Sequence, residues 1–458
     1  MNQTVSLSPP AGVGRALAAL ETAGWESWAV GGCVRDALLG RTPHDWDVTT
    51  AAPPEAVKAV FADKRVLETG LKHGTVTLLT EDGPVEITTF RTDGDYSDSR
   101  RPDSVAFVSD LHEDLRRRDF TVNAMAWSPL RGLRDDFGGR EDLSAGIIRC
   151  VGDPAERFAE DALRILRALR FAARYGFTLE EATARALRNL RERLKKVSME
   201  RIFSELKGIL TAPGAGEILR AFPEVFFTFL PEMEPMLGFD QRRPRAHHLD
   251  VWGHTALAVE SAPPDELVRL TMFFHDCGKP ATFSIDPETG LGRFLDHPKA
   301  GAALADELLR RLRCDSDTRR RVTELIANHQ MLDGHSRRVV RRLLSRLGEE
   351  DMRRLIEVLR ADARAHTPET CVKRLALADE DERMLNELLA ENACLHVRDL
   401  AVNGADLMAL GVSPGPVMGR ILSGLLEEVM DDTLPNRREE LLRRAAELWK
   451  DASGPEQP

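Results

Sequence analysis

Hydrophobic and polar positions alternate in two different ways along the chain. In the N-terminal third, short β-like runs such as GTVTLLT (74–80) and PVEITTF (84–90) are separated by turns rich in Gly, Pro and Asp. Helical stretches are predicted in the same region at 11–24 and 53–62. This mixture predicts an α+β domain built around a small sheet.

After Asp153 and Pro154 the β-like runs stop, and helical periodicity continues to the C-terminus. A Pro-rich stretch at 223–244 indicates a junction between helical blocks. We therefore predict an α+β N-terminal domain followed by three all-α parts. The predicted boundaries are 1–150, 151–240, 245–370 and 371–458.

Composition is that of an ordinary globular protein. The 458 residues exceed what a single core usually holds, and 42% are hydrophobic while 30% are charged. No apolar run approaches the length of a membrane helix and no signal-peptide pattern opens the chain, so no membrane partner is expected. Six cysteines without a CxxC pair predict reduced thiols and a cytoplasmic location. The oligomeric state is not readable from the sequence.

The net charge of −11 hides basic segments. Residues 164–207 carry twelve Arg or Lys against five Glu and no Asp, and 310–346 is rich in Arg. Such faces can bind a phosphate backbone, because binding responds to the local field. A solvated helix face held by salt bridges explains the same charges.

Two carboxylates follow a pair of glycines in AVGGCVRDALLGRTPHDWDVTT (29–50). Asp45 and Asp47 flank Trp46, and residues i and i+2 of a strand project from the same face. Two neighbouring carboxylates repel each other unless a cation lies between them, and Mg²⁺ with oxygen ligands suits that position. A polar surface strand is the alternative explanation.

Three more residues extend this candidate site. Gly31 and Gly32 lack Cβ atoms, so backbone N–H groups can approach phosphate oxygens at the start of a helix. Glu86 lies in a strand-like run and is the candidate third carboxylate. Together these features predict a two-metal site that holds a nucleoside triphosphate and stabilises the leaving pyrophosphate.

A row of charged residues follows in RFAEDALRILRALRFAARYGF (157–177). On a helix Asp161 and Arg164 share a face, and Arg167 and Arg170 continue that row. An Asp accepts from an exocyclic amine and an Arg donates to a ring nitrogen or carbonyl, so the pair can read the edge of cytosine or adenine. An ordinary ion pair on an amphipathic helix is the alternative.

Histidines and aspartates form a series in the second half of the chain. The adjacent His275 and Asp276 in FFHDCGKP, with distant partners, suit one or two divalent cations. A single His is more often a core residue than a metal ligand, but a whole series of this kind seldom occurs by chance and indicates a metal site. Its members are His254, His275, Asp276, His297, His329 and Asp362.

The order of GG, RD, LLG and DxD resembles the nucleotidyltransferases of the DNA polymerase β superfamily, and more narrowly the bacterial class II CCA-adding enzymes. DLRRRDFTVNAMA (114–126) and the segment 403–422 also match that family. The resemblance implies a polymerase-β-like head with a small mixed sheet, an all-α neck, an HD body and a tail that grips tRNA.

The resemblance also implies roles for individual residues. Arg118 would contact the triphosphate, while Asp119 and Asn123 would hold the ribose; Asp161 and Arg164 would select CTP and then ATP. Asp45, Asp47 and Glu86 would be catalytic, with Mg²⁺ held by the two aspartates. The remaining implied nucleotide contacts are Gly31, Gly32, Arg35, Arg167 and Arg170.

HDxGKP with an upstream His and a later Asp resembles the HD phosphohydrolase superfamily. This resemblance implies that His254, His275, Asp276 and Asp362 bind a second divalent metal of unknown identity. His297 and His329 would bind a further metal or the leaving phosphate.

The function predicted on this basis is template-independent addition of CCA from CTP and ATP to the 3′ end of tRNA, with an accessory HD phosphohydrolase activity. An enzyme that adds only A and a poly(A) polymerase are the near alternatives, and the full-length loop at 92–104 disfavours CC-only addition. The distant alternative is an HD-type metal phosphohydrolase with an inactive transferase head.

Overall fold

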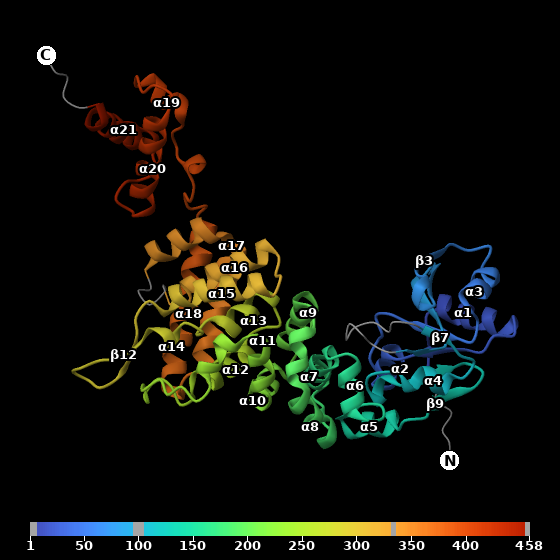
Figure 1. Cartoon of the computed structure of the whole chain (residues 1–458). Coiled ribbons are helices and arrows are strands. Elements are labelled where there is room, and N and C mark those ends of the chain that lie inside the picture. The colour runs from blue at the N-terminus through green and yellow to red at the C-terminus, as the bar shows by residue number, and fades with distance from the viewer. Residues whose placement is uncertain (1–6, 95–104, 331–335, 454–458) are drawn as a thin grey trace. The chain divides into compact units, whose positions relative to one another are not determined.

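A computed structural model describes residues 7–94, 105–330 and 336–453 of the chain (Figure 1). It divides into two compact units, Met1–Glu234 and Pro235–Pro458, which are described separately below. Most of the predicted loop at 92–104 lies outside the described residues. None of the described helices is both long enough and apolar enough to span a membrane.

The first unit begins with a mixed seven-stranded sheet. Its strand order is β3-β4-β5-β2-β1-β8-β9, and every neighbouring pair is antiparallel except β2 with β5, which is parallel. The strands are β1 (Ser27–Val30), β2 (Asp47–Thr50), β3 (Val66–Gly70), β4 (Thr75–Thr80), β5 (Gly83–Thr89), β8 (Met125–Ser128) and β9 (Gly132–Asp135). A separate pair is formed by β6 (Arg91–Asp93) and β7 (Val105–Phe107). The predicted small mixed sheet is confirmed.

Short helices accompany this sheet. The buried residues of α1, Val13, Ala16, Leu17 and Leu20, follow helical spacing, so one face of the helix packs on the core. The elements are α1 (Ala11–Thr22), α2 (Gly32–Leu38), α3 (Pro54–Val60), η1 (Leu71–His73), α4 (Leu111–Arg116), η2 (Thr121–Asn123) and α5 (Gly139–Ala145).

The rest of the first unit is largely helical. Its helices are α6 (Pro154–Glu160), α7 (Leu163–Tyr175), α8 (Glu181–Leu190), η3 (Arg191–Lys196), α9 (Met199–Leu210), α10 (Ala215–Ala221) and α11 (Pro223–Phe229). Figure 1 shows α7 beside α9. The prediction that strands stop after Pro154 was wrong in one detail here, because β10 (Ile147–Ile148) pairs with β11 (Thr178–Leu179).

The helix expected to carry both Asp161 and Arg164 is broken. Asp161 follows the last residue of α6 with an extended backbone, φ −135° and ψ 103°, and α7 begins at Leu163. The Asp161 side chain then accepts a hydrogen bond from Leu163 N at 3.0 Å, as a capping residue does. The helical spacing argument therefore fails for Asp161, which lies at the break between two helices.

The second unit is almost entirely helical. It contains α12 (Val251–Ser261), α13 (Glu266–Phe274), α14 (Lys279–Thr282), α15 (His297–Arg311), α16 (Ser316–Asn328), α17 (Arg337–Arg364), α18 (Pro368–Ala390), η6 (Val397–Asp399), α19 (Gly404–Ala409), α20 (Pro416–Met430) and α21 (Arg438–Ser453). One hydrophobic cluster joins α16, α17 and α18, and a separate cluster joins α19, α20 and α21. The short η4 (Pro231–Met236) falls at the division between the units.

A hairpin interrupts the second unit, where only helices were predicted. The strands β12 (Phe283–Ile285) and β13 (Gly292–Phe294) pair in antiparallel fashion. Asp286 accepts hydrogen bonds from Glu288 N and Thr289 N, which stabilises the turn between them. The turn is encoded by the local sequence DPETG, and a search for helical periodicity does not detect such a turn.

Candidate functional site

Three acidic side chains share one face at the centre of the sheet. Asp47 and Glu86 are directly paired in the register of β2 and β5. Asp47 is the first residue of β2 and Asp45 lies just before the strand; both are exposed, whereas Trp46 between them is buried. The alternating exposure agrees with the predicted common face of Asp45 and Asp47, although Asp45 precedes the strand, and the register of the sheet places Glu86 beside Asp47.

These carboxylates repel one another. Loss of solvation raises the pKa of Asp47, and the negative charges of Glu86 and Asp45 raise it further, against the opposing pull of Arg118. A cation among the three would relieve this repulsion, so the donor set fits Mg²⁺. Within the described parts of the chain, the three do not form a group whose ligand atoms all lie within 4.8 Å of one another, so they line an open face.

The glycine pair shapes the turn between β1 and α2. Gly31 has φ 82°, and a Cβ atom there would lie 2.9 Å from Nη1 of Arg118. Its N–H donates to the carbonyl of Met125 at 3.1 Å, so this amide belongs to the sheet. The Gly31 amide is thus already paired, while the absence of a side chain at Gly31 lets the Arg118 guanidinium lie against the turn; phosphate binding by the amides of this turn stays a prediction.

A continuous polar network connects α2 with α7. Arg35 Nη1 donates to Asn123 Oδ1 at 2.5 Å, and Asn123 Nδ2 donates to Asp119 Oδ1 at 3.0 Å. Arg167 Nε donates to the other carboxylate oxygen of Asp119 at 2.8 Å. Burial alone would raise the pKa of Asp119, but Arg167 and the Asn123 hydrogen bond outweigh it and lower this pKa to about 2. Four of the predicted nucleotide contacts thus form one connected group.

The predicted base-reading residues have separate ionic partners. Arg164 donates to Glu160 Oε2 at 2.6 Å and to the carbonyl of Arg117 at 3.1 Å. Asp161 is bound by Arg201, a residue that the sequence analysis did not single out. Arg170 donates to Glu205 Oε2 at 2.6 Å. Asp161 and Arg164 lie near each other at the start of α7, but each is oriented by a partner outside that helix.

The histidine and aspartate series converges in the second unit. His254 Nε2 lies 2.9 Å from Asp362 Oδ1 and 3.5 Å from Asp276 Oδ2. His275 Nε2 lies 3.1 Å from Asp276 Oδ2 and 3.6 Å from Asp362 Oδ1. All four side chains are buried, and they come from α12, the end of α13 and α17. This spacing brings two imidazole nitrogens and two carboxylate oxygens around one point.

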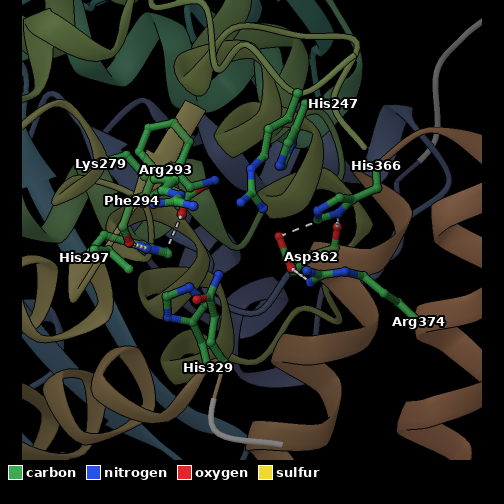
Figure 2. A pocket seen from close by; sticks show the side chains of 13 residues that line it. His247, Lys279, Arg293, Phe294, His297, His329, Asp362, His366 and Arg374 are labelled. Carbon is green, nitrogen blue, oxygen red and sulfur yellow. Dashed lines mark hydrogen bonds and ion pairs between the residues drawn. The ribbon is translucent and has the colours of Figure 1, made fainter. Parts of the chain in front are cut away.

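A second group adjoins the first. His297 Nε2 lies 3.5 Å from Asp276 Oδ1, and His329 completes a set of three whose ligand atoms lie within 4.8 Å of one another. Asp276 therefore faces the first group with one oxygen and the second with the other. Figure 2 shows His297 and His329 pointing into the same open space as Asp362 and His366.

The imidazoles are oriented as metal ligands usually are. In four of them Nδ1 bonds a backbone carbonyl, which turns Nε2 toward the cluster: the partners are Ala365 for His254, Met272 for His275, Phe294 for His297 and Ile326 for His329. Nε2 of His275 and of His297 is buried and, within the described residues, makes no hydrogen bond of good geometry. These unpaired atoms fit one or two divalent cations of the kind bound by imidazole and carboxylate.

The pKa values of these imidazoles are shifted in opposite directions. Burial would lower the pKa of His275, but Asp276 and Asp362 raise it to about 9. Burial, together with the repulsion of His275, lowers the pKa of His329 to about 3. The group therefore combines a stabilised imidazolium with neutral imidazoles, and a metal ion would replace the proton of the former.

A pocket of about 280 Å³ opens beside this cluster. Lys279 Nζ lies 2.6 Å from Asp276 Oδ2, and Arg374 Nη1 donates to Asp362 Oδ2 at 2.7 Å. His247 and His366 also line it (Figure 2). The sequence analysis missed both histidines; the only local signal was that His366 lies four residues after Asp362. Arg243 and Arg293 add positive charge to the pocket, which therefore suits an anionic ligand.

The Arg-rich segment 310–346 is largely a salt-bridged surface. Arg321 binds Asp351 with contacts down to 2.5 Å, Arg342 binds Asp431 at 2.9 Å, and Arg341 donates to Asp432 at 2.7 Å. Ion pairs within the protein therefore account for the charges of this segment without a nucleic-acid partner.

Three family models match the chain. The "Poly A polymerase head domain" matches residues 27–149, the "Probable RNA and SrmB- binding site of polymerase A" matches 176–236, and "tRNA nucleotidyltransferase domain 2 putative" matches 293–445. The first of these covers the sheet that carries Asp45, Asp47 and Glu86.

Curated relatives match over nearly the full length. A CCA-adding enzyme of Lacticaseibacillus paracasei is 34% identical over 94% of this chain and 95% of its own. One from Latilactobacillus sakei subsp. sakei is 35% identical over 93% of this chain and 95% of its own. Among solved structures, the Bacillus stearothermophilus CCA-adding enzyme in complex with CTP has a similar fold, with a TM-score of 0.70 and 24% identity over 96% of this chain and 98% of that one.

Proposed function

This chain belongs to the bacterial CCA-adding enzyme family, and we propose that it completes the 3′ end of tRNA by adding C, C and A from CTP and ATP without a nucleic-acid template. The observation that carries this proposal is the pairing of Asp47 with Glu86 beside Asp45 on one open face of the sheet. Pyrophosphate is the leaving group, and the 3′-hydroxyl of the tRNA is the nucleophile.

Asp45, Asp47 and Glu86 are the residues that would hold Mg²⁺. Bound there, Mg²⁺ neutralises the triphosphate and the charge that develops on the leaving group. The three carboxylates hold the cation and the reacting groups on one face of the sheet, where attack in line on the α-phosphate is favoured by positioning. A cation held there would offset the repulsion that Glu86 and Asp45 exert on Asp47.

Arg118 and the network behind it would bind the nucleotide. The Arg118 guanidinium lies against the Gly31 turn and acts on Asp47 electrostatically, which places it next to the acidic face and suits a triphosphate contact. Asp119 and Asn123 hold the ribose hydroxyls. Arg35 holds Asn123, Arg167 holds Asp119, and the two side chains bond each other, so the sugar would meet a preorganised surface.

Asp161 and Arg164 would select the base. Asp161 accepts from the exocyclic amine of cytosine or adenine, and Arg164 donates to a ring nitrogen or carbonyl. Arg170 supports this face through Glu205. The segment 403–422, which lies in the separate cluster of α19, α20 and α21, would contact the tRNA elbow. A cytoplasmic location stays a prediction.

Labelled-nucleotide addition with Mg²⁺ tests this function. Three tRNAs, ending at the discriminator base, in C and in CC, each receive CTP alone, ATP alone or both. Growth to a complete CCA end that then stops is the expected result. Addition of A only to the CC-ended tRNA would indicate an A-adding enzyme, and a long A tail on any RNA would indicate a poly(A) polymerase. No addition to any substrate would contradict the proposal.

A second candidate function, hydrolysis of a phosphate ester, is favoured by the way the buried Nε2 atoms of His275 and His297 face the two carboxylate oxygens of Asp276. His254, His275, Asp276 and Asp362 would hold one divalent metal, and His297 and His329 with Asp276 a further one. A metal held there supplies an activated water and polarises the phosphate. Lys279 and Arg374 orient the carboxylates, while Arg243 and Arg293 attract the anionic substrate to the pocket.

Separate substitutions distinguish the two functions. Asp45→Ala should abolish nucleotide transfer and leave hydrolysis of bis(p-nitrophenyl) phosphate unchanged, while His275→Ala should do the reverse. If His275→Ala alone abolished transfer, the assignment of the two sites would be wrong. If no divalent ion supported hydrolysis by the wild-type protein, the second function would be rejected.

A further inference from the structure

Asp161 has an ionic partner on a different helix. Arg201 Nη2 donates to Asp161 Oδ2 at 2.7 Å, and Arg201 Nη1 reaches Asp161 Oδ1 at 3.4 Å. Both side chains are only partly exposed, 15% for Asp161 and 21% for Arg201, so water weakens this pair less than it would a surface pair. Such a two-point contact fixes the orientation of the carboxylate as well as its position.

Arg201 is itself held in a rigid place. It lies in the first turn of α9, after Ser198. Further along the same helix Glu205 binds Arg170 of α7, and Gly208 allows close contact, because a Cβ atom there would lie 2.4 Å from Arg170 Cδ. These contacts fix α9 against α7, so Arg201 approaches the helix break at Asp161 from a constant direction.

The orientation of the Asp161 side chain depends on Arg201 because Asp161 lies at the break between two helices. Its backbone is extended between α6 and α7, so no helical hydrogen-bond ladder continues through it. Oδ1 is already engaged by Leu163 N at 3.0 Å. With Arg201 on the same carboxylate, both oxygens have a fixed donor, and the remaining lone pairs point in defined directions.

We propose that Arg201 is a positioning residue for base selection, which fixes the Asp161 carboxylate as an acceptor for the amino group of the incoming base. This inference rests on the proposed nucleotidyl transfer and names a further residue of that site. Cytosine and adenine present an amine donor at this edge, whereas uracil and guanine present a carbonyl acceptor. A carboxylate held by Arg201 can only accept hydrogen bonds, so it binds an amino group and repels a carbonyl oxygen.

Substituting Arg201 separates positioning from folding. Arg201→Gln keeps a polar side chain with an amide donor, but the side chain is shorter and both the charge and the two-point contact are lost. We expect KM for CTP and for ATP to rise about tenfold with a smaller change in kcat, because a hydrogen bond to a charged group is lost before chemistry. We also expect the preference for CTP over UTP to fall by a similar factor. Arg201→Lys keeps the charge without the grip and should recover part of both effects.

A matched control is available on the same surface. Arg193 Nη1 donates to the carbonyl of Ala159 at 3.4 Å, close to the same helix break but without an acidic partner at that contact. Arg193→Gln should leave KM and the CTP to UTP preference as in wild type. Thermal unfolding of all variants shows whether each one is folded. If Arg201→Gln does not fold, the same kinetic comparison is made with Arg201→Lys.

The outcomes separate this inference from the function on which it rests. If the wild-type protein transfers no nucleotide to tRNA, the proposed function fails. If the wild type builds CCA but the Arg201 variants keep wild-type KM values and base preference, the inference is overturned. A uniform loss of kcat for all nucleotides, without a change in KM or preference, would make Arg201 merely structural and would also overturn it.

Discussion

Asp47 and Glu86 lie directly opposite each other on neighbouring parallel strands, the only parallel pair in the seven-stranded sheet of the described residues. The pairing brings two residues that are distant in sequence to one face, and Asp45 joins them two positions before Asp47. Loss of solvation is the main cause of the raised pKa of Asp47, and the negative charges of Glu86 and Asp45 add to it. Such repulsion costs stability unless it serves binding.

Replacing one of these carboxylates should therefore separate activity from stability. Asp47→Asn removes a negative charge from the cluster, and we expect nucleotide transfer to fall by about 10²–10³-fold or more. The unfolding temperature should stay the same or rise, because repulsion with Glu86 and Asp45 is relieved. Single-turnover transfer and calorimetry check this. A clear loss of thermal stability would mean that Asp47 is mainly structural.

Gly31 and Gly32 should respond differently to the same substitution. Gly31→Ala places a Cβ at φ 82° and 2.9 Å from Arg118 Nη1, so we expect a loss of about 1 kcal/mol or more in unfolding free energy. Gly32→Ala is the matched control, because its nearest neighbour, Arg35 Nη2, would lie 3.5 Å away. Urea unfolding of the two variants gives the comparison. Equal stability losses would contradict this account of the turn.

Asp119 should make stability depend on pH at the acid end. Its pKa is lowered to about 2 in the folded protein, mainly by Arg167 against the effect of burial. A depressed carboxylate pKa stabilises the fold above the unfolded value near 4, and that stability is lost as pH falls toward 2. Asp119→Asn should therefore cost about 2 kcal/mol at pH 7, and the difference from wild type should shrink below about pH 4. Urea unfolding between pH 7 and pH 3 measures this difference; a constant value would exclude the linkage.

Tyr175 should support the network from the far end of α7. Its hydroxyl donates to Asp36 Oδ1 at 2.9 Å, and the Arg35 guanidinium lies 4.7 Å from its ring centre. Tyr175→Phe keeps the ring and removes the hydrogen bond, so we expect about 1 kcal/mol less stability. kcat/KM should fall a few-fold, because Asp36, which also accepts from Arg35 Nε at 2.9 Å, loses a donor and holds Arg35 less firmly toward Asn123. Unchanged kcat/KM would show that this end of the network does not reach the nucleotide.

The second unit should bind metal independently of transfer activity. Purified protein should contain divalent metal by mass spectrometry, and a chelator should lower the thermal stability because binding stabilises the folded state. His275→Ala should lose this metal and Asp45→Ala should keep it. Affinity should weaken as pH falls, because ligand imidazoles must be unprotonated. Metal content unaffected by His275→Ala would remove the cluster from consideration as a metal site.

Local patterns predicted the parts of the sites that depend on neighbours in sequence. The alternating exposure of Asp45, Trp46 and Asp47 was expected from the two-residue repeat of a strand, although β2 begins only at Asp47. The roles of Arg118, Asp119 and Asn123 were implied by a family resemblance and stay predictions. The helix break at Asp161 was missed, because helical periodicity continues on both sides of it, while locally the Asp161 side chain accepts a hydrogen bond from Leu163 N. The hairpin at 283–294 was missed for a similar reason, since its turn is set by a single Asp.

The sequence by itself determined the mixed class of the fold, the acidic face of β2 and the residue types of the histidine series. Only the tertiary structure decided which distant residues meet. His254 and Asp362 are 108 positions apart yet lie 2.9 Å from each other, and Arg201 meets Asp161 across two helices. Periodicity reports which face of an element is buried, whereas partners are chosen by how whole elements pack. Packing therefore decided three features: the pairing of Glu86 with Asp47, the presence of His247 and His366 at the pocket, and the contact of Arg201 with Asp161.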